Sequence, residues 1–116
     1  GRVSKGAVRL LEGTGAVTGI TIPQLLRASH AKPWAECESD VERLNVYNGF
    51  LLSAHLDALF DSGLISFDDS GLIIISSKLP TAELCQLGID HKTSLRWIDN
   101  RHHPFLAWHR EKVFLQ

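Results

Sequence analysis

The clearest pattern along the chain is an apolar stripe between Ala54 and Asp61. It is formed by Leu56 and by two residues that follow it at spacings of three and four, Leu59 and Phe60. This spacing predicts a helix with one buried face. Ser53 is well placed to cap the start of this helix, and Gly63 is suited to end it.

Short runs of β-branched and aromatic residues lie on both sides of a polar turn directly after this helix. The runs are residues 64–67 and 72–75, and Asp68-Asp69-Ser70-Gly71 separates them. This arrangement predicts a β-hairpin. A further apolar run, Phe50 to Leu52, follows Asn48-Gly49, a dipeptide typical of turns, and we expect it to form a buried strand.

The remaining segments carry weaker signals. We expect a short helix over residues 5–12, a strand or turn over 16–20, and a strand-like segment that begins near Gln24 and ends at His30. The polar, acidic stretch 35–47 predicts a surface loop with a helical turn, and Trp34 is expected to pack in the core beside it. Two later helices are expected, over residues 81–87 after Pro80 and over 103–114.

Length and composition indicate one folded domain. The chain has 116 residues, of which 44% are hydrophobic and 22% charged, and these values are ordinary for a globular protein. Apolar runs such as Leu72 to Ile75 are far shorter than the roughly 20 residues that a membrane helix needs. We therefore interpret residues 1–116 as a single α+β domain. The chain has no Met, even at position 1, and no signal-peptide pattern, which suggests a domain excised from a larger protein.

The charge balance limits how the chain can bind nucleic acid. Lys plus Arg number 12 and Asp plus Glu 13, for a formal charge of −1. Non-specific binding to DNA depends on a basic excess that neutralises phosphates. The composition therefore argues against a stand-alone DNA-binding protein, but not against an active site whose DNA is delivered by another domain.

The cysteines carry no metal-binding pattern. Cys37 and Cys85 are far apart and neither belongs to a CxxC pair, so a cysteine zinc knuckle is excluded. One disulfide is formally allowed, but two isolated cysteines in a core of ordinary size are more typical of a reduced, cytoplasmic protein.

The residues with candidate chemistry lie between positions 27 and 61. A strand, a loop, a second strand and a helix would bring a histidine, an amide and carboxylates to one cleft: His30, Asn48, His55, Asp57 and Asp61. A histidine accepts a proton from water near neutral pH, and carboxylates can hold a divalent metal beside a phosphate. Asp57 and Asp61 share a helix face because they are four residues apart. Arg27 and Lys32 are candidates for phosphate contacts. Each residue also has an alternative without chemistry. His30 would be a surface or capping residue, Asn48 a turn residue and His55 a packing residue at the helix start. The carboxylates would form a solvated helix face, and Arg27 and Lys32 would be solvated charges.

Several short sequence motifs around these residues resemble those of a known family. They are Ala16-Val17-Thr18-Gly19, Leu25-Leu26-Arg27-Ala28-Ser29-His30, Lys32-Pro33-Trp34, Asn48-Gly49-Phe50-Leu51-Leu52 and the run from His55 to Ile65. In this order they resemble the HNH endonucleases. The closing His109-Arg110-Glu111-Lys112-Val113-Phe114 is similar to the end of many such domains.

The resemblance implies a ββα-metal core, here with an added β-hairpin and flanking helices. His30 matches the general base and Asn48 the middle Asn that braces the loop. Asp57 matches the metal ligand on the helix, and Asp61 lies one helical turn further on. His55 is the alternative ligand, because it matches the last histidine of the H-N-H pattern. Ser29 stands where the family usually has a metal-binding Asp, Glu or His.

The function implied is metal-dependent hydrolysis of DNA, as the cleavage module of a restriction or defence nuclease. Carboxylate ligands favour one Mg²⁺ or Mn²⁺, and a His ligand would also admit Zn²⁺ or Ni²⁺. The near-zero charge predicts that a separate domain or subunit recognises the DNA, and cleavage of both strands would suit a homodimer. The alternative is an HNH-fold module that has lost its metal through Ser29 and only binds DNA or protein. A different metallohydrolase is disfavoured because the chain lacks HExxH and clustered Cys/His ligands.

Overall fold

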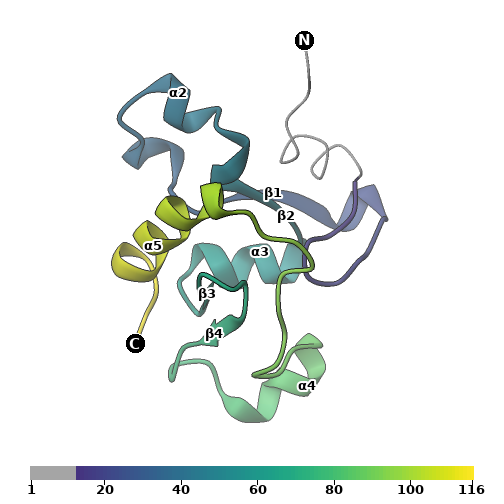
Figure 1. Ribbon diagram of the computed structural model, residues 1–116. Coiled ribbons are helices and arrows are strands. Elements are labelled where there is room, and N and C mark those ends of the chain that lie inside the picture. Colours follow the sequence, from purple (N-terminus) through teal and green to yellow (C-terminus); the bar gives the residue numbers. More distant parts are fainter. Residues whose placement is uncertain (1–12) are drawn as a thin grey trace.

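The first part of the fold is a β-hairpin with a helix directly after it. The computed structural model describes residues 13–116, so the helix expected over residues 5–12 lies outside the described part. Strand β1 (Leu26–His30) pairs antiparallel with β2 (Gly49–Ser53). Helix α3 (Ala54–Asp61) follows β2 without a loop and contacts both strands (Figure 1). This is the ββα order implied by the resemblance, in an α+β fold.

The register of the β1–β2 hairpin places the start of β2 opposite the end of β1. His30 is opposite Gly49 and Ser29 is opposite Phe50. A short 3-10 turn, η1 (Pro23–Leu25), precedes β1. The 16–20 segment forms a turn, and its Ala16 amide donates to Leu51 O at 2.6 Å.

A long connection joins β1 to β2, and it is more ordered than the sequence suggested. It contains η2 (Trp34–Glu36), the single-turn helix α2 (Asp40–Arg43) and η3 (Val46–Asn48). The turn expected at Asn48-Gly49 is found one residue earlier: Asn48 ends the 3-10 turn, whereas Gly49 is extended, with φ −126° and ψ 150°, and is the first residue of β2.

The second half of the chain forms a separate two-stranded sheet and two helices. Strands β3 (Ile65–Phe67) and β4 (Ile73–Ile75) pair as the predicted hairpin. The helix predicted at 81–87 is divided into η4 (Thr81–Glu83) and α4 (Leu84–Leu87), and Gly88 ends it in the left-handed conformation. A 3-10 turn, η5 (Asn100–His102), leads into α5 (His103–Lys112), which contacts β3.

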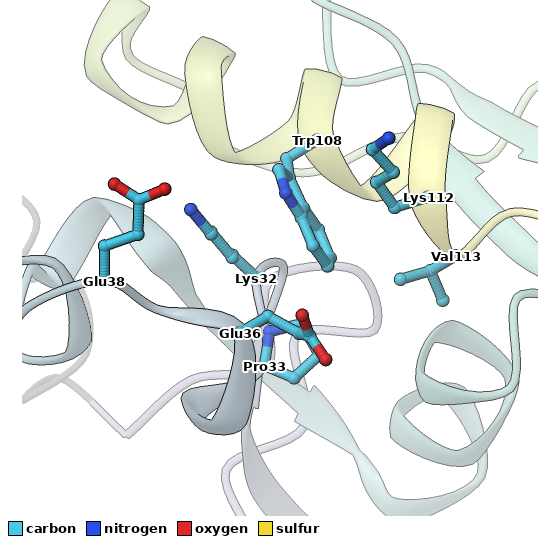
Figure 2. Close-up of a pocket in the computed structure, with 7 residues that line it drawn as sticks. All are labelled: Lys32, Pro33, Glu36, Glu38, Trp108, Lys112 and Val113. Carbon is cyan, nitrogen blue, oxygen red and sulfur yellow. The ribbon is translucent and has the colours of Figure 1, made fainter.

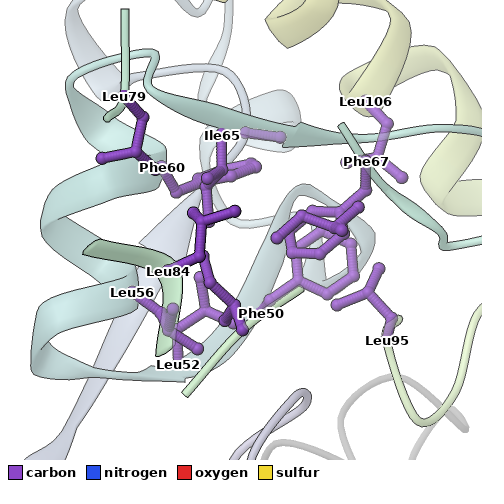
Figure 3. Close-up of a cluster of buried hydrophobic side chains, with 13 residues drawn as sticks. Phe50, Leu52, Leu56, Phe60, Ile65, Phe67, Leu79, Leu84, Leu95 and Leu106 are labelled. Atoms are coloured by element: carbon purple, nitrogen blue, oxygen red, sulfur yellow. The ribbon is translucent and has the colours of Figure 1, made fainter. Parts of the chain in front are cut away.

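The core joins the two halves. Aromatic rings from β2, α3 and β3 meet in it, those of Phe50, Phe60 and Phe67 (Figure 3). Burying such rings is the main favourable contribution to folding, about 2–3 kcal/mol for each ring. Leu106 of α5 is fully buried against the same cluster, so the last helix docks on the core as predicted.

Two histidines of the C-terminal region are also part of this core. His109 stacks on Phe60 with ring centroids 3.7 Å apart, and His102 stacks on Phe50 at 4.8 Å. His109 Nε2 lies 2.7 Å from Phe60 O and its Nδ1 2.8 Å from Ser66 Oγ. Desolvation lowers the pKa of His109 to about 4, so the ring is neutral and acts as a structural link between α5 and α3.

The start of α3 differs from the prediction in one detail. Ser53 occupies the N-cap position, but its hydroxyl makes no capping hydrogen bond and lies instead 3.2 Å from His55 Nδ1. Across residues 13–116, no helix is both long and apolar enough to cross a membrane.

Candidate active site

Ser29 joins the end of β1 to α3. It is 1% exposed, and its hydroxyl donates a hydrogen bond to Oδ1 of Asp57. The next residue, His30, is half-buried at the last position of the strand. Ser29, which stands where the family usually has a metal ligand, is therefore in direct contact with Asp57 on α3.

Asp57 and Asp61 form the acidic side of the site. They lie one turn apart on α3. Partial burial and then the negative charge of Asp57 raise the pKa of Asp61, while His30 acts in the opposite direction. Asp61 thus lies within electrostatic reach of both Asp57 and His30.

Asn48 is the most enclosed polar residue of the candidate set, with 0% exposure. Its Oδ1 accepts from the Lys32 amide at 2.7 Å, and its Nδ2 donates to Lys32 O at 2.9 Å. Its own carbonyl accepts from the Ala31 amide at 2.9 Å. These three bonds hold the backbone of residues 31 and 32, directly after His30.

His55 lies away from the two carboxylates. Its Nδ1 faces the Ser53 hydroxyl and its Nε2 lies 3.0 Å from Leu87 O at the end of α4. Residues two apart on a helix do not share a face, so His55 and Asp57 point in different directions.

The two basic candidates differ in their surroundings. Arg27 is exposed, and its Nη1 donates to Gln24 O at 3.1 Å and Leu26 O at 2.9 Å. Lys32 forms an ion pair with Glu42, Nζ to Oε1 2.7 Å, and its ammonium lies 5.7 Å from the centre of the Trp108 ring. The hydrogen bond to Glu42 raises the pKa of Lys32.

The Lys32 side chain lines an open pocket of about 590 Å³ between the 32–38 segment and α5 (Figure 2). The pocket has both acidic and basic walls: Lys32, Pro33, Glu36, Glu38, Trp108, Lys112 and Val113. His30, Asp57 and Asp61 are not among these residues, so this pocket is separate from the candidate active site.

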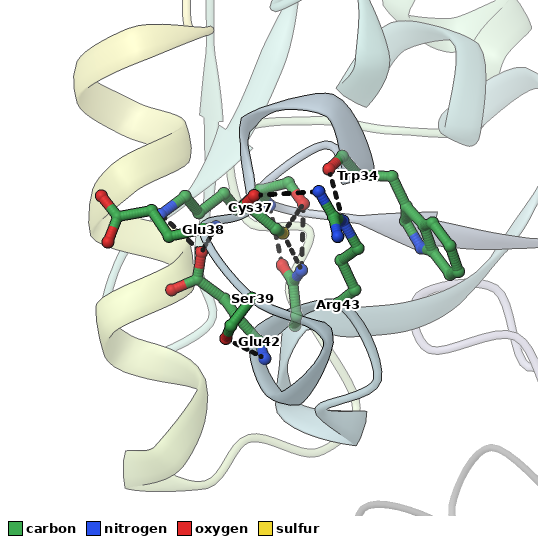
Figure 4. Close-up of polar contacts among 8 residues, drawn as sticks. Trp34, Cys37, Glu38, Ser39, Glu42 and Arg43 are labelled. Atoms are coloured by element: carbon green, nitrogen blue, oxygen red, sulfur yellow. Dashed lines mark hydrogen bonds and ion pairs between the residues drawn. The ribbon is translucent and has the colours of Figure 1, made fainter.

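The loop that follows His30 in the sequence is held by a set of polar contacts (Figure 4). Arg43 donates from Nε to Trp34 O at 3.0 Å and from Nη2 to Cys37 O at 3.2 Å. Ser39 caps α2 by accepting from the Glu42 amide at 3.2 Å. Cys37 is buried and Cys85 exposed, and both are free thiols.

Trp34 is a residue of this site that sequence reasoning missed. The expectation that it packs in the core is wrong, since it is 53% exposed. Its indole Nε1 donates to His30 Nε2 at 3.2 Å. The sequence did contain a signal for this contact: Trp34 follows His30 by four residues, and Pro33 restricts the backbone between them.

Among residues 13–116, no three His, Cys, Asp or Glu side chains are grouped closely enough to hold a metal alone. Mg²⁺ is commonly bound by one or two carboxylates, with water and substrate phosphate completing its shell. Asp57 and Asp61 provide such a pair of oxygen donors. Partial burial is the main cause of the raised pKa of Asp61, and the negative charge of Asp57 adds to it. A bound cation would stabilise the charged form of Asp61 against both effects, so these residues fit the ion.

Comparison with known families finds a match for the segment that contains the candidate site. Residues 16–68 match the family model described as HNH endonuclease. This part of the chain is therefore similar to the HNH endonucleases. No curated protein matches the chain.

The HNH segment contains all the elements that build the candidate site. It runs from the turn at Ala16 through β1, β2, α3 and β3 to Asp68. Nuclease activity is the general function associated with this family. The long β1–β2 connection with Trp34 and Asn48 also lies inside the matched segment, whereas α5 lies beyond it.

Proposed function

We propose that this domain is a metal-dependent DNA endonuclease whose active site lies between the end of β1 and one face of α3. The observation that carries this proposal is the hydrogen bond from Ser29 to Asp57. It joins the residue before His30 to Asp57, and the effect of His30 on the pKa of Asp61, one turn along the same helix, further supports this location. A proton acceptor next to a hard-oxygen metal site is what hydrolysis of a phosphodiester requires.

His30 is proposed as the general base. Its half-buried position leaves the ring accessible to water, and a histidine can take a proton from water near neutral pH. Asn48 fixes the backbone at Lys32, so it acts by positioning His30 and the following loop.

Asp57 and Asp61 are proposed to hold one divalent ion, Mg²⁺ or Mn²⁺. When bound, such an ion stabilises charge on the scissile phosphate and on the departing oxygen. Zn²⁺ or Ni²⁺ would call for a histidine ligand, and both ring nitrogens of His55 have other neighbours. The arrangement therefore favours the harder ions. Ser29 orients Asp57 and is not itself a ligand in this proposal.

The substrate is proposed to be DNA, with target choice made by another domain or subunit. The formal charge of −1 offers little non-specific attraction to phosphates. Of the two basic candidates, Arg27 is the better placed for a phosphate contact, because the Lys32 ammonium is paired with Glu42. We further propose that the protein acts in restriction or defence, that it pairs into a homodimer and that it is cytoplasmic.

Nicking of supercoiled plasmid in Mg²⁺ and in Mn²⁺ tests this function. We expect metal-dependent nicking by the wild type and a loss of about 100-fold or more in His30→Ala, the contribution typical of a general base. His91→Ala removes an exposed histidine outside the family segment and should leave the rate unchanged. Absence of nicking by wild type in both metals would favour the alternative, an HNH-fold module that only binds DNA or protein.

A further inference from the structure

The hydrogen bond between Trp34 and His30 fixes the protonation of the histidine ring. An indole N–H can only donate, so His30 Nε2, 3.2 Å away, must accept with its lone pair. The two rings are perpendicular, with centroids 6.3 Å apart, as expected when an N–H points at a nitrogen in the plane of the imidazole. A neutral imidazole with an accepting Nε2 carries its proton on Nδ1.

This tautomer has no lone pair left for catalysis. One of the two ring nitrogens of a neutral histidine is protonated and the other is basic. In this protein the basic nitrogen is occupied by Trp34. A histidine in this state cannot accept a proton from water until the indole N–H moves away.

Trp34 is attached in a way that permits such a movement. Its backbone is held, because its carbonyl accepts from Arg43 Nε at 3.0 Å and from the Cys37 amide at 3.2 Å. Its side chain, by contrast, is 53% exposed. A rotation of the indole would therefore break the bond to His30 with little loss of core packing.

We propose that Trp34 is a positioning residue that blocks His30 in the free protein and releases it when a phosphodiester enters the site. An anionic phosphate oxygen is a stronger acceptor for an N–H than a neutral imidazole. The indole N–H passes from His30 Nε2 to the phosphate, so the ring regains an unoccupied lone pair, on Nε2 or, in the Nε2–H tautomer, on Nδ1. The base is then available only when substrate is present. This inference rests on the proposed role of His30 as the base.

Nitrogen NMR of the His30 ring tests the proposal without any measurement of activity. At a pH where His30 is neutral, the free wild-type protein should show the Nδ1–H tautomer. Trp34→Phe keeps an aromatic ring but removes the donor, and its His30 should shift toward the Nε2–H tautomer. Trp108→Phe, the matched control on α5, should leave the His30 signals unchanged.

A second arm needs no variant. A short DNA duplex added to wild-type protein in EDTA, where it cannot be cut, should move the His30 signals toward those of Trp34→Phe. The proposal is overturned if free wild type already has the Nε2–H tautomer, if Trp34→Phe retains the wild-type tautomer, or if saturating DNA leaves the signals unchanged.

Steady-state nicking separates release from simple support of the ring. Trp34→Phe should raise KM about threefold to tenfold, because one hydrogen bond to a charged phosphate is lost, while kcat stays within about twofold of wild type because the base is already free. A large fall in kcat at unchanged KM would contradict the proposal. Wild-type protein that nicks no DNA in any metal would refute the proposed function, whereas the tautomer results test the Trp34 contact by itself.

Discussion

Ser29 and Asp57 are joined by a hydrogen bond that links the end of strand β1 to helix α3. The serine is almost completely buried at 1% exposure, so its hydroxyl has this carboxylate in place of water. The bond orients Asp57 toward the end of β1, where His30 follows. A small polar residue at position 29 therefore supports the carboxylate rather than adding a second acidic group beside it.

Ser29→Ala should lower the free energy of unfolding by about 1–2 kcal/mol, since hydrogen bonds to charged groups contribute at that level or above. Urea denaturation at neutral pH measures this. Ser62→Ala, which removes an exposed hydroxyl bonded to Leu59 O, is the control and should change stability by less than about 0.5 kcal/mol. Equal effects of the two substitutions would mean that the bond to Asp57 contributes nothing specific.

Asn48→Ala should loosen the backbone after His30. The substitution removes both side-chain bonds to Lys32 inside a fully enclosed site, and each buried group left unpaired costs about 1–3 kcal/mol. Hydrogen exchange of the Lys32 amide should become faster, and nicking should slow. If exchange at Lys32 stays as slow as in wild type, Asn48 does not brace this loop.

Stability should fall as the pH drops from 7 to 5 because of His109. Burial lowers its folded-state pKa to about 4, and the unfolded value is about 6.5, so the unfolded state binds more protons across this window. The loss between pH 7 and 5 is about 2 kcal/mol from this group. Desolvation also lowers the pKa of His102, which adds a loss of the same sign.

Urea denaturation of wild type and His109→Gln at both pH values isolates the contribution of His109. The glutamine variant should be less stable at pH 7 but lose less stability on acidification, with the remaining slope due to His102 and the carboxylates. A pH dependence equal to that of wild type would show that His109 is not buried in its neutral form.

Gly63 and Gly88 provide a matched pair of left-handed glycines, with φ of 81° and 73°. A Cβ at Gly63 would overlap the carbonyl oxygen of Val113, whereas one at Gly88 would meet nothing within 4 Å. Gly88→Ala should cost only the left-handed strain, about 1–2 kcal/mol. Gly63→Ala should cost clearly more because the C-terminal segment must also move. Equal thermal shifts in the two variants would contradict the close approach of residues 63 and 113.

Local patterns predicted the elements that depend on neighbouring residues. The apolar spacing of Leu56, Leu59 and Phe60 predicted a helix over residues 54–61, and α3 has these limits, because helix periodicity and side-chain burial agree there. The hairpin around residues 68–71 was predicted because its turn and both strands are contiguous.

Features that depend on distant partners were missed or wrong. The turn expected at Asn48-Gly49 ends one residue earlier, because pairing with β1 holds Gly49 extended. The exposure of Trp34 depends on how the long connection folds over β1, and the ion pair of Lys32 depends on where α2 places Glu42. The burial of His109 could not be read from its polar neighbours, because it depends on Phe60 and Ser66 in other elements.

The same division applies to the site. His30, Asn48 and Asp57 were predicted from the motifs shared with a known family. In the structure Asp57 contacts Ser29, the residue before His30. The surroundings of His55 and the bond from Trp34 to His30 depend on side-chain directions, which a linear pattern does not contain.

The central claim is that Asp57 and Asp61 hold the metal ion beside His30, and anomalous diffraction from crystals soaked in Mn²⁺ tests it most directly. The account predicts one anomalous peak in direct coordination with both carboxylates, absent from a soaked Asp57→Asn, Asp61→Asn double variant. No peak at this position, or a peak coordinated by His55 and neither aspartate, would contradict it.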